Sequence, residues 1–126
     1  MNQIPTEKFK KIAADVATVC AEVLRDLRNT PEEDWTQEDE GMFHLSGAYL
    51  LLYRETNLRE IEIQRLLTVT ANACVSTIDK YNNIPQAKWS PYDKSLHLMC
   101  NVYIQLFNAA VNAKKLSRVN NPNTLN

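Results

Sequence analysis

Glycine is nearly absent from this chain, since Gly41 and Gly47 are the only two in 126 residues. An all-β architecture with many tight turns normally uses far more glycine than this. Hydrophobic residues make up 44% of the chain and charged residues 23%, close to the averages of globular domains. The composition therefore predicts a mostly helical protein, and the length fits a single domain with its own hydrophobic core.

Apolar spacing predicts where the helices lie. From Phe9 to Leu27 the apolar residues recur every three or four positions, which is typical of an amphipathic helix. We expect three more helices, over about 37–55, from near Asn57 to Tyr81, and from Ser90 to about Lys114. Only a tight turn or a kink is expected between the second and the third.

Four helices of similar length joined by short loops favour an all-α, single-domain four-helix bundle with up-down-up-down topology. The bundle is expected to comprise residues 1–116. The helical spacing is lost after Lys114, so residues 117–126 are predicted to form a mobile C-terminal tail. We detect neither an internal repeat nor a second domain in the sequence.

Six carboxylates surround one tryptophan in the stretch TPEEDWTQEDE, residues 30–40. Residues 30–33 have the pattern of a capping box at a helix start, residues 36–39 repeat it in weaker form, and residues 90–93 combine a cap, a proline and an acid. Acidic side chains in a first helical turn interact favourably with the helix dipole. Helix-start chemistry therefore explains several of these acids without any function.

The charge balance and the cysteines limit the class of protein. Fourteen basic and fifteen acidic side chains give no overall field that would attract nucleic acid or an anionic membrane. Three widely spaced cysteines do not suggest a disulfide framework. No apolar stretch is long enough for a signal sequence or a spanning helix, so we expect a soluble, cytoplasmic protein without a membrane partner.

The catalytic patterns that we tested each lack a required residue. A di-iron or di-manganese bundle uses Glu-x-x-His pairs, but Gly41 stands three residues before His44 and Lys94 three before His97. No phosphate-binding glycine loop, dinucleotide fingerprint or nucleophile elbow is present. We therefore expect no enzyme, no catalytic residues and no cofactor.

One possible metal set depends on the bundle topology. Cys20, His44, Cys74 and Cys100 lie at similar depths from one end of the predicted bundle, and a Cys₃His set can bind zinc. Free cysteine is also among the most buried residue types. The favoured interpretation is a reduced apolar layer, with the metal site as the less probable alternative.

The leading functional hypothesis is a small non-enzymatic protein, an adaptor or an inhibitor, that binds another protein. The first alternative is a nucleic-acid accessory protein that uses a basic patch near the two chain ends, and a metal-dependent helical enzyme is a weaker one. The patch would comprise Lys8, Lys10, Lys11, Lys114, Lys115 and Arg118. Phe9 is the one aromatic side chain among these lysines and is expected to face the core, so nucleic-acid binding is the less favoured hypothesis.

Two surfaces are candidates for protein contacts. The loops after the first and third helices should emerge at one end of the bundle, where their tryptophans would either dock a basic partner or cover the core. The predicted docking residues are Trp35, Trp89, Tyr81, Tyr92, Glu38, Asp39 and Glu40. The segments AYLLLY and VYIQLF are apolar on several faces, which predicts a homodimer through Tyr49, Leu52, Val102 and Leu106.

Overall fold

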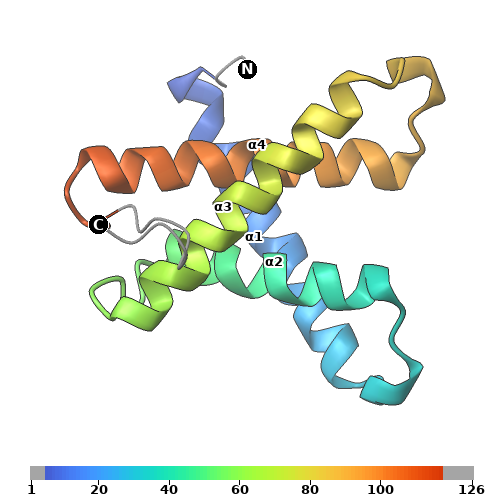
Figure 1. Cartoon of the computed structure of the whole chain (residues 1–126), viewed down its shortest axis with the longest axis horizontal. Helices are drawn as coiled ribbons and strands as arrows, with labels where there is room; N and C mark the ends of the chain where they lie inside the picture. Colours follow the sequence, from blue (N-terminus) through green and yellow to red (C-terminus); the bar gives the residue numbers. More distant parts are fainter. Residues whose placement is uncertain (1–4, 118–126) are drawn as a thin grey trace.

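The computed structural model describes residues 5–117, and within them the chain is all-α, as predicted. Its four helices are α1 (Thr6–Arg28), α2 (Gln37–Tyr53), α3 (Ile61–Asn82) and α4 (Pro91–Asn112) (Figure 1). A short 3₁₀ turn lies in the loop after α1 (Glu32–Asp34) and another in the loop after α3 (Gln86–Lys88). None of the helices in this part of the chain is both long and apolar enough to cross a bilayer.

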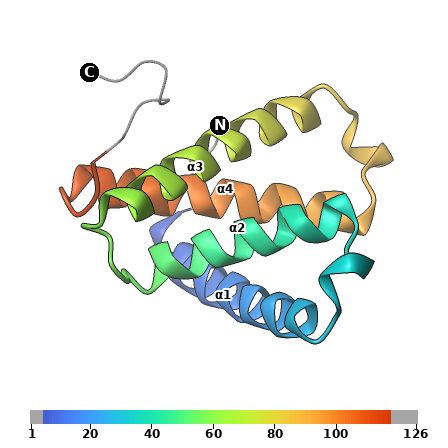
Figure 2. The ribbon, with the colours of Figure 1, turned by 60° about the horizontal axis from the view of Figure 1, so that its bottom comes forward.

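The helices pack as two hairpins, α1 with α2 and α3 with α4. Figure 2 shows the loops inside both hairpins on one side of the molecule and the α2–α3 connection on the other. In Figure 1, however, α3 crosses α4 obliquely, so the helices do not form a bundle of parallel rods. A regular up-down-up-down bundle therefore stays a prediction.

The two hairpins are repeats of one unit, so the expectation of no internal repeat was wrong. When 54 is added to each residue number, the range of α1 falls on that of α3 and the range of α2 on that of α4. The 3₁₀ turns of the two loops also coincide. This shift also aligns the loop pattern Asn-x-Pro-x-x-x-Trp, residues 29–35, with residues 83–89. The identical residues are few and scattered, and even buried positions differ between the halves, as Ala13 and Leu67 do.

A buried tyrosine joins the two helices of each hairpin. The Tyr49 hydroxyl on α2 donates a hydrogen bond of 2.8 Å to the carbonyl of Ala13 on α1. In the second hairpin the Tyr103 hydroxyl donates one of 2.7 Å to the carbonyl of Leu67. Both tyrosine side chains are 0% exposed, and each bond spans 36 residues. These equivalent bonds fix how the helices of each hairpin lie along one another.

The connection between the hairpins is longer than predicted. Residues 54–60 form an irregular loop, and α3 begins at Ile61 rather than near Asn57. Glu55 and Asn57 have φ of 54° and 58°, a left-handed conformation that turns the chain sharply. Leu58, directly after the second of these residues, is buried in the core and anchors the loop.

Of the three predicted capping signals, one was wrong and two were correct. The Thr30 hydroxyl donates to the Asp26 carbonyl at the end of α1, and the following 3₁₀ turn has no side-chain cap. The true start of α2 is the capping box that had been judged weaker, in which Thr36 and Asp39 bond each other's backbone N–H groups. The same reciprocal pair begins α4 at Ser90, with Pro91 at the first helical position.

The predicted dimer face lies largely inside the molecule. Tyr49, Leu52 and Val102 are 0%, 3% and 0% exposed, and Leu106 is partly buried against the core. Their placement on outer faces was therefore wrong, because crossed hairpins bury more of α2 and α4 than a simple bundle does. The homodimer itself stays a prediction. The proposed tail, residues 117–126, lies outside the described residues except for Ser117.

The paired tyrosine bonds lead to a prediction about stability. Tyr49→Phe and Tyr103→Phe should each lower the free energy of unfolding by about 0.5–1.5 kcal/mol, because each removes one buried hydrogen bond and preserves the ring. Urea denaturation measures the loss. Tyr53→Phe is the control, since Tyr53 is exposed and its hydroxyl has no hydrogen-bond partner among residues 5–117. An equal loss in this control would contradict the assignment.

Candidate functional site

Trp35 and Trp89 each close the loop of their own hairpin. The Trp35 indole N–H donates to the Thr30 carbonyl at 3.0 Å, and its ring lies 5.1 Å from that of Phe43. The Trp89 indole N–H donates to the Ile84 carbonyl, also at 3.0 Å. Both indoles are half-buried. These contacts support a role in covering the core, and a role in docking stays a hypothesis.

The two tryptophan loops do not meet at one surface. In Figures 1 and 2 they form separate corners of the molecule, with the N-terminal turns of α2 and α4 between them. Both loops emerge at the same end, as predicted, but the hairpins diverge towards this end and the loops stand apart. Any docking surface must therefore be built from other residues.

Tyr81 links the second tryptophan loop to the start of α4. Its ring lies 5.3 Å from that of Trp89, and its hydroxyl donates to Asp93 Oδ1 at 2.8 Å. Burial, and then the bond to this carboxylate, raise the pKa of Tyr81 to about 12. Bonds from the Ser90 backbone and from Tyr81 hold the pKa of Asp93 below its ordinary value. Tyr81 thus reinforces the cap of α4 and is buried rather than available for docking.

An open groove of about 470 Å³ lies where the hairpins meet. Its apolar lining comes from three helices: Met42 and Leu45 of α2, Leu66, Val69 and Ala73 of α3, and Tyr92 and Leu96 of α4. Several of these side chains are accessible, with Leu66 36%, Val69 56% and Tyr92 38% exposed. Contiguous exposed apolar surface of this kind marks binding sites.

Carboxylates border one end of this groove. Glu38 lines it, and burial together with the charges of Glu38, Asp39 and Asp93 raises the pKa of the Tyr92 phenol. The Tyr92 phenol thus interacts electrostatically with acids from the starts of both α2 and α4. Glu40 is exposed in the same turn of α2. The groove therefore combines an apolar wall with a negative border.

The predicted metal set is not assembled. Cys74 of α3 and Cys100 of α4 lie together in the core, and their interaction and their burial raise the pKa of Cys74. Burial raises the pKa of Cys20 to about 11, while His44 is exposed. Among residues 5–117 no three histidine, cysteine or acidic side chains are close enough to hold a metal ion. The thiols instead pack as small apolar groups in the core.

The predicted basic patch is partly neutralised. Lys11 pairs with Asp15 at 2.9 Å and Lys115 with Glu55 at 2.7 Å. Both pairs are exposed, so they contribute little stability, yet each lysine has a local counter-charge. Arg118 lies outside the described residues. Nothing in this arrangement favours the nucleic-acid hypothesis over protein binding.

Only some of the predicted docking residues lie at the groove. Glu38, Asp39 and Tyr92 lie at or near it, whereas Trp35, Trp89 and Tyr81 belong to the loop closures. Sequence reasoning missed the wall from α3, although Leu66, Val69 and Ala73 recur at helical spacing. Comparisons with models of protein families, with curated proteins and with solved structures find no match to this chain.

The Asp93 contacts predict a dependence of stability on pH. Because the folded pKa of Asp93 lies below its ordinary value of 3.8, its stabilising contribution is complete above that pH and is lost as the pH falls through the lowered folded pKa. Asp93→Asn should therefore flatten the loss of stability over this acidic range. Urea midpoints measured across the range test it. Asp34→Asn, at an exposed carboxylate without a hydrogen-bond partner within residues 5–117, should leave the slope unchanged.

Proposed function

We propose that the protein is a non-catalytic binding protein that takes an amphipathic, basic segment of another protein into the groove between its hairpins. The observation that carries this proposal is the accessible apolar wall beside a cluster of carboxylates. A partner segment with apolar residues on one face and lysine or arginine beside them would satisfy both features. By binding this segment, such a protein acts as an adaptor or an inhibitor of its partner.

The apolar wall supports a helical occupant. Leu66, Val69 and Ala73 follow one another along a single stripe of α3, at a spacing of three and four residues. Met42 and Leu96 face this stripe across the groove from α2 and α4. A helix that lies along such a channel buries one apolar face and leaves its other face in water, which is a recurrent mode of peptide recognition.

The charges support a basic occupant. Asp39 is used by the capping box of α2, but Glu38 and Glu40 form no ion pair within the described residues. At the border of an apolar groove these carboxylates attract positive side chains and disfavour negative ones. The expected effect is on the rate of association and on orientation, and it should weaken as salt is added.

Two designed peptides test this function. One carries leucine along one helical face and lysine elsewhere, and the other keeps the leucines and has glutamate in place of lysine. Fluorescence anisotropy of the labelled peptides should show that the lysine peptide binds more tightly, with an affinity that falls as salt rises. Equal or tighter binding of the glutamate peptide would contradict the proposal.

Val69→Asp should weaken binding of the lysine peptide by tenfold or more, since it places a charge on the apolar wall. The matched control is Val75→Asp, because Val75 is a similarly exposed valine of α3 that does not line the groove. Both variants should unfold at urea concentrations close to that of the parent protein. If Val75→Asp weakened binding as much as Val69→Asp, the groove would not be the site.

A further inference from the structure

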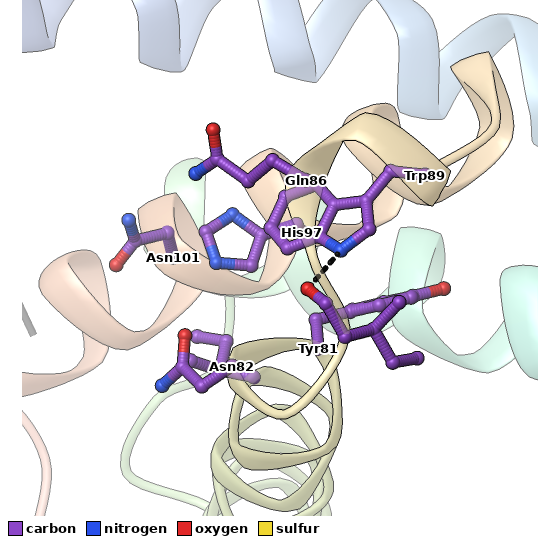
Figure 3. Close-up of a pocket in the computed structure, with 8 residues that line it drawn as sticks. Tyr81, Asn82, Gln86, Trp89, His97 and Asn101 are labelled. Atoms are coloured by element: carbon purple, nitrogen blue, oxygen red, sulfur yellow. Dashed lines mark hydrogen bonds between the residues drawn. The ribbon is translucent and has the colours of Figure 1, made fainter.

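A second pocket, of about 420 Å³, lies within the α3–α4 hairpin and is separate from the groove. Aromatic rings form part of its wall, since Trp89 lies 4.8 Å from His97 and 5.3 Å from Tyr81 between ring centroids. Figure 3 shows the side-chain amides of Asn82, Gln86 and Asn101 arranged around the imidazole of His97. The pocket thus brings three amides and an imidazole together beside flat aromatic surfaces.

The polar groups of this pocket are not used by the fold. The amides of Asn82, Gln86 and Asn101 have no hydrogen-bond partner in the part of the chain that the structure describes. His97 makes only ring contacts there, with Tyr81 and Trp89. Every one of these groups is therefore available to a ligand.

The first hairpin provides an internal comparison. The shift of 54 residues pairs Asn82, Gln86, His97 and Asn101 with Arg28, Glu32, Phe43 and Gly47. Phe43 packs against Trp35 at 5.1 Å, much as His97 packs against Trp89. The repeat therefore requires an aromatic ring at this position but neither an imidazole nitrogen nor the surrounding amides. The polar set is a feature of the second hairpin alone.

The chemistry of the lining restricts the ligand. No lysine, arginine, aspartate or glutamate lines the pocket, so a ligand with a full charge would lack a counter-charge there. A carboxamide offers both donors and an acceptor, and an imidazole can offer one of each. The half-buried Trp89 indole in the lining suits a flat ligand, and side-chain amides pair well with the edges of bases. The volume falls within the range of small-molecule sites.

We propose that this pocket binds a neutral, planar heteroaromatic ring of the nucleobase type, whose edge is recognised by Asn82, Gln86, Asn101 and His97. The base belongs to a free nucleoside or to an unpaired nucleotide of a single strand. This inference does not rest on the peptide-binding function, because the two sites share no lining residue.

The two tryptophans allow the pocket to be tested in one sample. Adenosine, guanosine, cytidine and uridine, and then short single-stranded oligonucleotides, are titrated into ¹⁵N-labelled protein while the two indole N–H resonances are followed. At least one nucleoside should shift the Trp89 resonance in a saturable way and leave that of Trp35 in place. Tighter binding of an oligonucleotide than of its nucleoside would identify the single strand as the source of the base.

Two variants test the recognising groups. His97→Phe installs the residue of the first hairpin and should weaken nucleoside binding at least fivefold while the Trp89 loop stays closed. Asn101→Ala should weaken nucleoside binding to a similar extent. This variant keeps the test informative if His97→Phe disturbs folding. Phe43→His, at the equivalent place in the first hairpin, should leave the affinity unchanged.

Four results would overturn the proposal. The first is no shift of the Trp89 resonance with any of the four nucleosides at millimolar concentration. The second is an equal shift of the Trp35 resonance, which would indicate non-specific stacking. The third is unchanged affinity in both folded His97→Phe and Asn101→Ala. Methyl glucoside serves as the non-aromatic control, and tighter binding of this sugar than of any nucleoside would also reject a planar ring.

Discussion

The hydrogen bond from a buried tyrosine to a backbone carbonyl of the neighbouring helix is the contact on which each hairpin depends. A phenol inside a protein core must find a partner, and the carbonyls of Ala13 and Leu67 are the ones that Tyr49 and Tyr103 reach. This requirement sets the position of one helix along the axis of the other. With that position fixed, the loop at the hairpin end has a defined span, and its tryptophan can bond the carbonyl five residues before it.

Local sequence signals predicted the helices well, because those signals act within one helical turn. The spacing from Phe9 to Leu27 and the caps at Thr36 and Ser90 are of this kind, and the structure has helices at all three places. Errors arose where a local pattern had two uses. Thr30 closes α1 rather than capping a new helix. The AYLLLY segment of α2 is apolar on several faces, so its periodicity cannot distinguish a buried helix from one with a surface for a partner.

The candidate groove could be predicted only in part. Its acidic border follows from the sequence, because Glu38 and Asp39 stand at a helix start. Its apolar wall depends on how α3 packs across α2 and α4, which no local pattern specifies. Val69 and Val75 illustrate the difficulty, since both are exposed valines on α3 and only one of them lines the groove. The repeat itself was hidden because its constant features are a few contacts and a loop pattern rather than long identical stretches.

The duplicated hairpin also bears on how the chain reaches its folded state. The key contact inside each half joins residues 36 positions apart, so closing either half costs about the same chain entropy and needs nothing from the other half. The contacts of α4 with α1 and α2 join residues of greater separation and form more slowly on average. We therefore expect each hairpin to assemble before the two dock. Leu58, in the loop that connects them, is then a residue at which docking can be followed, because it belongs to a buried cluster that contains side chains of both halves.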